Sequence, residues 1–286
     1  MSEILKIAVQ KSGRLSENTL QLLKDCGIKV SSVANRLKEK AANFPAEVLF
    51  LRDDDIPEYV QDGVADIGIV GENIVTEQGK NINETEKLGF GKCRLSLAVE
   101  KNAVCDSLSF FNGKRIATSY PVILGNFLKK NRINATIHEI SGSVEIAPGI
   151  GLAEGICDIV SSGSTLFSNG LKEVETVFHS EAVLISGKNL NAEKKKILDK
   201  LIFRIRSVNN AKNNKYILLN TPDEKLAEII SILPGMKSPT VLPLAEKGWS
   251  SVHSVISDEQ FWEVIDQLKQ AGAQGILIVP IEKMVV

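Results

Sequence analysis

Residues 62–71 read Asp-Gly-Val-Ala-Asp-Ile-Gly-Ile-Val-Gly, and residues 154–163 read Glu-Gly-Ile-Cys-Asp-Ile-Val-Ser-Ser-Gly. The two stretches share one order: an acidic residue, a Gly, an Asp, a short apolar run and a final Gly. That order is typical of a helix end, a tight turn, a buried strand and the loop after it, since Gly favours helix ends. Two copies of one unit predict two similar lobes with a cleft between them. The alternative is that any α/β protein reuses such turns.

Short apolar runs alternate with amphipathic stretches on both sides of these two copies. They predict strands at 4–9, 48–51, 67–70, 95–99, 115–118, 159–160 and 182–185, with helices between most of them. Ser16 is expected to cap the first helix, which should end at Gly27. Strands alternating with helices predict an α/β fold with a mainly parallel sheet.

The pattern changes from about Asn213. Strands at 215–220, 240–244, 252–256 and 275–281, with two helices between them, give the order βαββαβ of a ferredoxin-like module. Thr221 to Glu224 and Ser257 to Gln260 each have the residue types of a capping box at the start of a helix.

Composition excludes several classes of protein. The chain has 286 residues, 43% hydrophobic and 24% charged, which suits about two globular domains with room for a small third. Its formal net charge is -1 without a basic run, so we expect no nucleic-acid partner. The four cysteines are scattered without zinc-ligand spacing. No apolar segment reaches 18 residues and no signal peptide is evident, so we expect a cytoplasmic protein without membrane association.

The best candidate for chemistry is Asp158-Ile-Val-Ser161-Ser162-Gly163-Ser164-Thr165. A buried strand ends in a loop of small hydroxyl residues, and a helix begins near Thr165. Backbone N–H groups and hydroxyls in such a loop suit a phosphate, and Asp158 is placed for sugar hydroxyls. The alternative is a well-capped helix, since Ser and Thr are also preferred at helix starts.

Two further segments end strands at the same predicted sheet edge. Lys11, Arg14 and Arg52 suit polyphosphate there, or else face water. Asp53 to Asp55 suggest either magnesium or a solvated loop. Glu145 follows a helix start that Ser143 is expected to cap, where the helix dipole favours its carboxylate.

Taken together, these residues resemble the long form of the ATP phosphoribosyltransferase family. The resemblance rests on motifs in order along nearly the whole chain, at 10–15, 52–57, 66–73, 91–98, 113–121, 141–148, 158–166 and 169–175. They are followed by Leu-Pro-Gly-Met-Lys-Ser-Pro-Thr-Val at 233–241 and Pro-Ile-Glu-Lys-Met at 280–284. It implies two lobes resembling periplasmic binding proteins, with the catalytic cleft between them, and a C-terminal regulatory domain of the ferredoxin-like (ACT-like) type. The implied boundaries are 1–94 with 183–212, 95–182, and 213–286.

The resemblance also implies the reaction. Adenine N1 of ATP attacks C1 of 5-phosphoribosyl 1-pyrophosphate, giving N1-(5-phosphoribosyl)-ATP and pyrophosphate, the first committed step of histidine biosynthesis. Mg²⁺ is the implied cofactor, held mainly by substrate. Histidine, together with AMP, is the implied inhibitor, and the implied assembly is a homo-oligomer, dimer to hexamer.

By the same resemblance, Ser161, Ser162, Gly163, Ser164 and Thr165 hold the 5-phosphate, and Asp158 and Glu145 face the ribose. Lys11, Arg14, Arg52 and Gly71 lie at the ATP side. The catalytic residues that the resemblance implies are Lys11, Arg14, Glu145 and Asp158. Asn220, Thr240, Ser254 and Gly275 match the histidine site, although Asn220 stands where relatives often carry an acid. Residues 122–126 lack the basic pair common in relatives.

Two other readings of the sequence are a two-lobed sensor or solute-binding protein without chemistry, and a catalytically silent regulatory subunit. The first would be supported by an export signal or a DNA-binding helix-turn-helix, and the second by loss of the hydroxyl loop.

Overall fold

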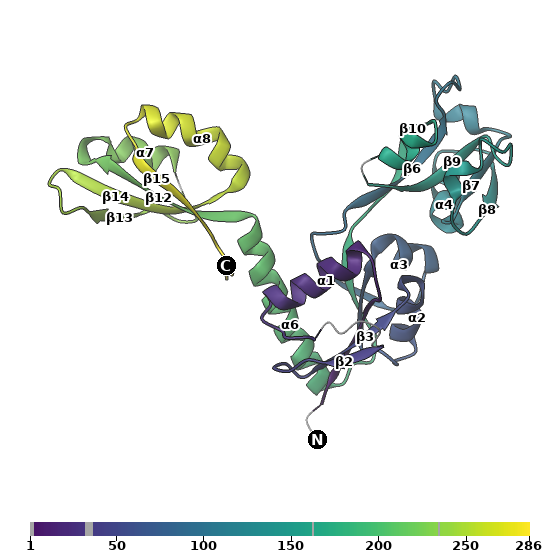
Figure 1. Ribbon diagram of the computed structural model, residues 1–286, viewed down its shortest axis with the longest axis horizontal. Helices are drawn as coiled ribbons and strands as arrows, with labels where there is room; N and C mark the ends of the chain where they lie inside the picture. The colour runs from purple at the N-terminus through teal and green to yellow at the C-terminus, as the bar shows by residue number, and fades with distance from the viewer. Residues whose placement is uncertain (1–2, 32–36, 162, 234) are drawn as a thin grey trace. The chain divides into compact units, whose positions relative to one another are not determined.

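The computed structural model describes residues 3–31, 37–161, 163–233 and 235–286. Contacts between residues divide the chain into two compact units, Met1–Asp199 and Lys200–Val286. The first unit holds two β-sheets and the second holds one (Figure 1). Within the described ranges, no helix combines the length and the apolar character needed to cross a membrane.

The first sheet, which we call lobe I, has the strand order β2-β3-β1-β4-β11-β5. β1 runs parallel to β3 and β4, and β11 runs antiparallel to β4 and β5. Its strands are β1 (Leu5–Gln10), β2 (Lys38–Lys40), β3 (Ala46–Leu51), β4 (Ile67–Gly71), β5 (Asn83–Lys87) and β11 (Ala182–Ser186), and its helices are α1 (Arg14–Asp25), η1 (Asp53–Asp55), α2 (Ile56–Gln61) and α3 (Glu72–Gln78). Apolar residues on both faces of β1 and β4 are buried, as expected of central parallel strands.

The second sheet, lobe II, has the strand order β10-β6-β9-β7-β8. β7 is parallel to β8 and β9, and β6 is antiparallel to β9 and β10. Its elements are β6 (Cys93–Glu100), η2 (Leu108–Phe111), β7 (Arg115–Thr118), α4 (Pro121–Lys130), β8 (Thr136–Glu139), η3 (Val144–Ile146), β9 (Gly155–Val160), α5 (Ser164–Ser168) and β10 (Leu171–Ser180).

The two lobes share one topology. The order β3-β1-β4-β11-β5 in lobe I matches β8-β7-β9-β6-β10 in lobe II, strand for strand and direction for direction. The repeated sequence at 62–71 and 154–163 lies on β4 and β9, which are equivalent strands in this match. The prediction of two similar lobes from this repeat is therefore confirmed.

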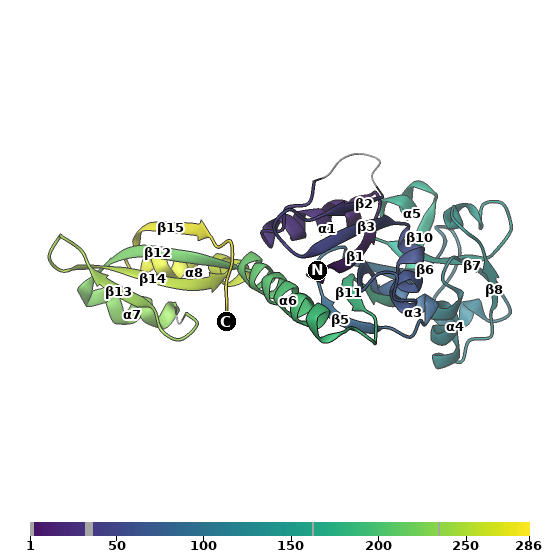
Figure 2. The same ribbon diagram turned by 90° about the horizontal axis from the view of Figure 1, so that it is seen from below.

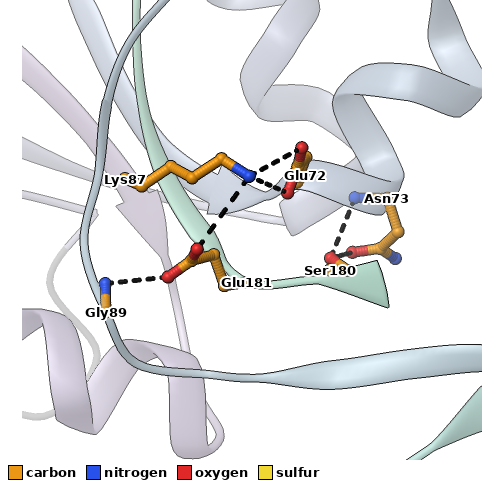
Figure 3. Close-up of polar contacts among 6 residues, drawn as sticks. All are labelled: Glu72, Asn73, Lys87, Gly89, Ser180 and Glu181. Carbon is orange, nitrogen blue, oxygen red and sulfur yellow. Dashed lines mark hydrogen bonds and ion pairs between the residues drawn. The ribbon is translucent and has the colours of Figure 1, made fainter. Parts of the chain in front are cut away.

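The chain crosses between the lobes twice. Residues 88–92 join β5 to β6, and Glu181 alone joins β10 to β11. Close to these crossings, Glu181 accepts a hydrogen bond from the Gly89 N–H at 3.0 Å and lies 3.9 Å from Lys87 Nζ (Figure 3). Both crossings are thus tied to each other by side-chain contacts.

The second unit forms a four-stranded sheet in the order β13-β14-β12-β15, with α7 and α8 beside it (Figure 2). Its elements are β12 (Asn214–Pro222), η4 (Asp223–Lys225), α7 (Leu226–Ile232), β13 (Thr240–Pro243), β14 (Trp249–Ser257), α8 (Asp258–Gln270) and β15 (Gln274–Pro280), and α6 (Ala192–Lys212) precedes them. A core that includes Ile217, Leu219, Ile229, Val252 and Leu268 fills it. The predicted α/β class, with two lobes and a C-terminal βαββαβ module, is confirmed. The predicted mainly parallel sheet is wrong, because β11 runs antiparallel to β4 and β5, and β6 runs antiparallel to β9 and β10, so the sheet of each lobe is mixed.

Three predicted helix starts need correction. The first helix begins at Arg14, directly after Gly13, because the left-handed backbone of Gly13 (φ 93°) turns the chain into the helix. Ser16 therefore lies inside the helix, where it is buried, and does not cap it. Thr221 lies within β12 and caps nothing, since that strand continues to Pro222. Ser143 has no side-chain cap, and only a single 3-10 turn follows it. The capping box at Ser257 is confirmed, with Gln260 N 3.2 Å from the Ser257 hydroxyl.

Candidate active site

The parallel strands of both lobes end in loops that carry polar side chains. In lobe I these loops follow β1 and β3, while β4 passes directly into α3, and in lobe II they follow β7, β8 and β9. Open α/β sheets bind ligands at such carboxyl ends of strands. A cavity of about 380 Å³ lies here, lined from lobe I by Asp53, Asp54, Ile74, Glu77 and Gln78 and from lobe II by Ser119, Tyr120, Ser141 and Gly142.

Tyr120 is a residue of this cavity that contacts both lobes. Its ring packs against a hydrophobic cluster of lobe I that includes Ile74 and one of lobe II that includes Leu124. Its hydroxyl lies 3.2 Å from the Asn73 side-chain nitrogen, which donates to it. Thr118 Oγ1 positions the loop, because it accepts the Tyr120 N–H at 2.9 Å and donates to the Cys157 carbonyl at 2.7 Å.

Carboxylates from both lobes raise the pKa of the Tyr120 hydroxyl. Burial raises the pKa of Tyr120 well above its usual value of 10.0, and the charges of Asp158, Asp54 and Asp53 raise that pKa further. The phenol therefore stays neutral at physiological pH and serves as a hydrogen-bonding group. Asp53 and Asp54 lie in η1 of lobe I and Asp158 lies in β9 of lobe II, so carboxylates of both lobes contribute to this rise.

Asp158 and Glu145 form a carboxylate pair in lobe II. Asp158 is half-buried, and desolvation, followed by the charge of Glu145, raises the pKa of its carboxyl above 3.8. Its Oδ1 accepts the Ile159 N–H at 2.7 Å. The residue lies inside β9 rather than just before the loop, because β9 continues to Val160. Two nearby carboxylates suit binding of sugar hydroxyls and stabilisation of positive charge.

The loop after β9 contains the predicted phosphate-binding residues. Ser161 is exposed, and Gly163 has φ 79°, a left-handed conformation that a Cβ disfavours. Ser164 and Thr165 open α5. Ser162, like the side chains of Ser164 and Thr165, lies outside the described part of the chain.

Three predicted cations lie at the end of lobe I. The Lys11 N–H donates to the Leu51 carbonyl at 2.7 Å, which places Lys11 and Arg52 on adjacent strand ends. Arg14 opens α1, and all three side chains are exposed. Among the described residues, no hydrogen bond or ion pair joins them to Asp158 or Glu145.

Gly71 ends β4 at the start of α3. A Cβ there would overlap the side-chain oxygen of Asn73, which accepts the Ser180 hydroxyl at 2.9 Å. Gly71 therefore leaves room for the Asn73 amide.

Asn73, Glu77 and Tyr120 are site residues to which sequence reasoning assigned no role. The Tyr120-Pro121 pair signals a helix start, since Pro is favoured there. No local pattern links Asn73 or Glu77 of α3 to α4, which lies far along the chain.

A metal site built by the protein alone is not evident. In the described segments, no group of three or more His, Cys, Asp or Glu side chains is arranged to hold an ion. Asp53 to Asp55 instead form the 3-10 turn η1.

The residues predicted to bind histidine fall into two pairs. Thr240 and Ser254 line a cavity of about 540 Å³ in the second unit. The Ser254 hydroxyl is buried and has no hydrogen-bond partner within the described residues. Asn220 and Gly275 lie beside each other, since a Cβ at Gly275 would be 3.4 Å from the Asn220 side-chain nitrogen, but neither lines that cavity.

Comparison with known proteins supplies the family. A family model described as "ATP phosphoribosyltransferase" matches residues 52–207, and one described as "HisG, C-terminal domain" matches residues 211–283. The chain is 62% identical over 285 residues to an ATP phosphoribosyltransferase of Cytophaga hutchinsonii, covering 100% of both chains. It is 59% identical over 283 residues to that of Bacteroides thetaiotaomicron, covering 99% of this chain and 100% of the relative.

Among solved structures, the chain is similar to a chain of the "ATP phosphoribosyl transferase (HisG:HisZ) complex from Thermotoga maritima". The TM-score is 0.60 at 26% identity, and the match covers 71% of this chain and 96% of that one.

Proposed function

The chain belongs to the ATP phosphoribosyltransferase family, in its long form, and from this premise we propose how its residues carry out the reaction. The reaction joins ATP and 5-phosphoribosyl 1-pyrophosphate into N1-(5-phosphoribosyl)-ATP and pyrophosphate, the first step of histidine biosynthesis. One observation supports placing the reaction in the cleft between the lobes. Tyr120 lines a cavity shared by both lobes, and the charges of Asp158, Asp54 and Asp53 all raise its pKa. We also propose the domain division 1–94 with 183–212, 95–182, and 213–286.

Phosphoribosyl pyrophosphate binds to lobe II in this proposal. The 5-phosphate accepts hydrogen bonds from the loop Ser161 to Thr165, where Gly163 turns the backbone with φ 79°. Asp158 and Glu145 accept hydrogen bonds from the ribose hydroxyls. Their charges also stabilise the positive charge that develops on the sugar as pyrophosphate leaves.

ATP binds to lobe I in this proposal. Lys11, Arg14 and Arg52 contact its phosphates or the leaving pyrophosphate, where exposed cations neutralise developing negative charge. Gly71, at the end of β4, lies beside the nucleotide. Adenine N1 is unprotonated near neutral pH, so the protein needs to orient it toward C1 rather than remove a proton.

Magnesium fits this site as an ion held mainly by substrate. Carboxylate oxygens suit Mg²⁺, and the pair Asp158 and Glu145 leaves most coordination positions to pyrophosphate and water. When bound, Mg²⁺ would neutralise charge on the pyrophosphate.

Histidine regulation and assembly complete the proposal. We place the histidine site in the second unit, with Thr240 and Ser254 in its cavity and Asn220 and Gly275 beside it. The Thermotoga maritima relative is a HisG:HisZ complex, and we propose that this chain assembles with copies of itself, from dimer to hexamer.

A direct assay tests the activity. The protein is mixed with ATP, phosphoribosyl pyrophosphate and Mg²⁺, with pyrophosphatase present, and the absorbance of the N1-substituted adenine is followed with and without histidine. We expect a rise in absorbance that histidine slows. A flat trace in both conditions, with a known enzyme active in the same buffer, would reject the enzyme and favour a binding protein.

A further inference from the structure

One helix of lobe I connects the crossings between the lobes to the catalytic cavity. At its start, α3 is tied to the crossings by two contacts: Lys87 Nζ lies 3.2 Å from the Glu72 carboxylate, and Asn73 N donates to the Ser180 hydroxyl at 3.1 Å (Figure 3). Ser180 ends β10, directly before Glu181 of the second crossing. The start of α3 is therefore held where the lobes join.

The same helix contacts lobe II along one face. Figures 1 and 2 both show α3 beside α4. Asn73 and Glu77 are four residues apart, so they lie on the same side of the helix. The Asn73 amide donates to the Tyr120 hydroxyl at 3.2 Å. The Glu77 carboxylate accepts the backbone N–H groups of Val122 at 2.8 Å and Ile123 at 3.0 Å.

The negative charge of Glu77 suits its position beside the first N–H groups of α4. The first N–H groups of a helix have no partner within that helix, and the helix dipole favours a negative group beside them. Residues 122–126 carry no basic side chain that would compete for the carboxylate. Hydrogen bonds from backbone N–H groups to an ionised carboxylate are also stronger than neutral ones.

The consequence lies in the cavity. Glu77 and Tyr120 both line it, and Tyr120 directly precedes the first turn of α4 that Glu77 holds. A shift of α4 away from α3 would move Tyr120 and Ser119 relative to Asp53 and Asp54 on the other side. The distance between the two halves of the substrate site therefore depends on this contact.

We propose that Glu77 is a positioning residue, whose carboxylate fastens the first turn of α4 in lobe II to α3 in lobe I and so sets the spacing of the two substrate subsites. It touches no reacting atom. This proposal rests on the phosphoribosyltransferase activity, because its effect is on how the two substrates meet.

Kinetics of two Glu77 variants give the first test. Glu77→Ala removes both acceptor oxygens. We expect it to raise KM for both substrates about tenfold, which corresponds to about 1.4 kcal/mol of binding free energy, and to change kcat much less. Glu77→Gln keeps one uncharged acceptor, so its KM should lie between those of Glu77→Ala and the unaltered protein. Glu58→Ala is the matched control, since Glu58 pairs with Lys80 inside lobe I.

A distance measurement separates positioning from loss of folding and does not depend on activity. Spin labels on Lys24→Cys in α1 and Lys129→Cys in α4, both exposed positions, report the spacing of the lobes in a background with Cys93 and Cys105 replaced by Ala. For Glu77→Ala we expect a longer and broader distance than for the parent, restored by saturating substrates. Unchanged KM values or an unchanged distance distribution would overturn the proposal, whereas an inactive parent protein would reject the proposed function instead.

Discussion

Ionisation of the Asp158 carboxyl lowers the stability of the fold, although the proposed reaction requires the ionised form. Desolvation and the neighbouring Glu145 raise the pKa of its carboxyl above the ordinary 3.8, so the folded protein binds this proton more tightly than the unfolded chain does. Stability associated with Asp158 is therefore lost as pH rises from 3.8 through the raised pKa. A buried carboxylate whose ionisation lowers the stability of the fold is typical of a functional site.

The change Asp158→Asn tests this reading. If the ionised carboxylate stabilises the sugar in the transition state, activity should fall at least about 100-fold, in the range found for removal of one electrostatic group. The unfolding temperature at neutral pH should stay the same or rise, because an uncompensated charge is removed. In the parent, kcat/KM should fall as pH drops through the raised pKa, and this acid limb should be absent in the variant. Asp106→Asn, an exposed acid of lobe II, is the control. Full activity of Asp158→Asn would contradict its role.

Gly71 is needed because a side chain at its position would overlap the Asn73 side chain. A Cβ would meet the Asn73 side-chain oxygen and displace an amide that bonds both Ser180 and Tyr120. We expect Gly71→Ala to lower the free energy of unfolding by about 1–3 kcal/mol, the usual cost of overpacking. Urea unfolding measures it. Gly125→Ala in α4, where the new Cβ would be 3.7 Å from Ile137, should be neutral or stabilising. Equal effects of both changes would contradict the account.

The loop after β9 is the structural element that the proposed function depends on most. Gly163→Val places a β-branched side chain at φ 79°, so the loop must change its backbone conformation. We expect binding of phosphoribosyl pyrophosphate, measured by calorimetry, to be lost while the fold persists. Gly170→Val is the matched control, because Gly170 has φ 69° and lies beyond the loop. Unchanged affinity of Gly163→Val would remove the loop from the phosphate site.

Sequence reasoning succeeded for elements where local chemistry and global fold agree. The repeat on β4 and β9 predicted two lobes, and Ser257 predicted the start of α8, since its hydroxyl and Gln260 satisfy backbone groups locally. It failed where tertiary structure decides: Thr221 has the residue pattern of a cap, yet pairing with Ser250 keeps it in β12.

The candidate site divides in the same way. Gly163 and Asp158 were recognisable because a strand end followed by small hydroxyl residues is a local pattern. The role of Glu77 was not recognisable, because its partners Val122 and Ile123 lie 45 and 46 residues away. They contribute only backbone N–H groups, which every residue other than Pro has, so no residue type in the sequence indicates the contact.

At the scale of the whole molecule, two compact units divide the proposed tasks of catalysis and regulation. The first unit contains the cavity shared by both lobes, and the second contains the cavity with Thr240 and Ser254. The Ser254 hydroxyl, which has no partner among the residues that the structure describes, is suited to a polar ligand, since buried hydroxyls without partners are unfavourable.

Ser254→Ala tests the regulatory role. We expect the histidine concentration for half-inhibition to rise about tenfold, equivalent to about 1.4 kcal/mol. The unfolding temperature should stay the same or rise, because an unsatisfied hydroxyl is removed. Activity without histidine should be unchanged. Inhibition that keeps its histidine dependence would place the effector site elsewhere.

The most direct test of the central claim is a crystal structure of the protein with phosphoribosyl pyrophosphate and Mg²⁺ bound. We expect the 5-phosphate within hydrogen-bonding distance of the backbone N–H groups between Ser161 and Thr165, with the ribose hydroxyls directed to Asp158 and Glu145. A sugar phosphate seated elsewhere, with that loop touching only solvent, would contradict it.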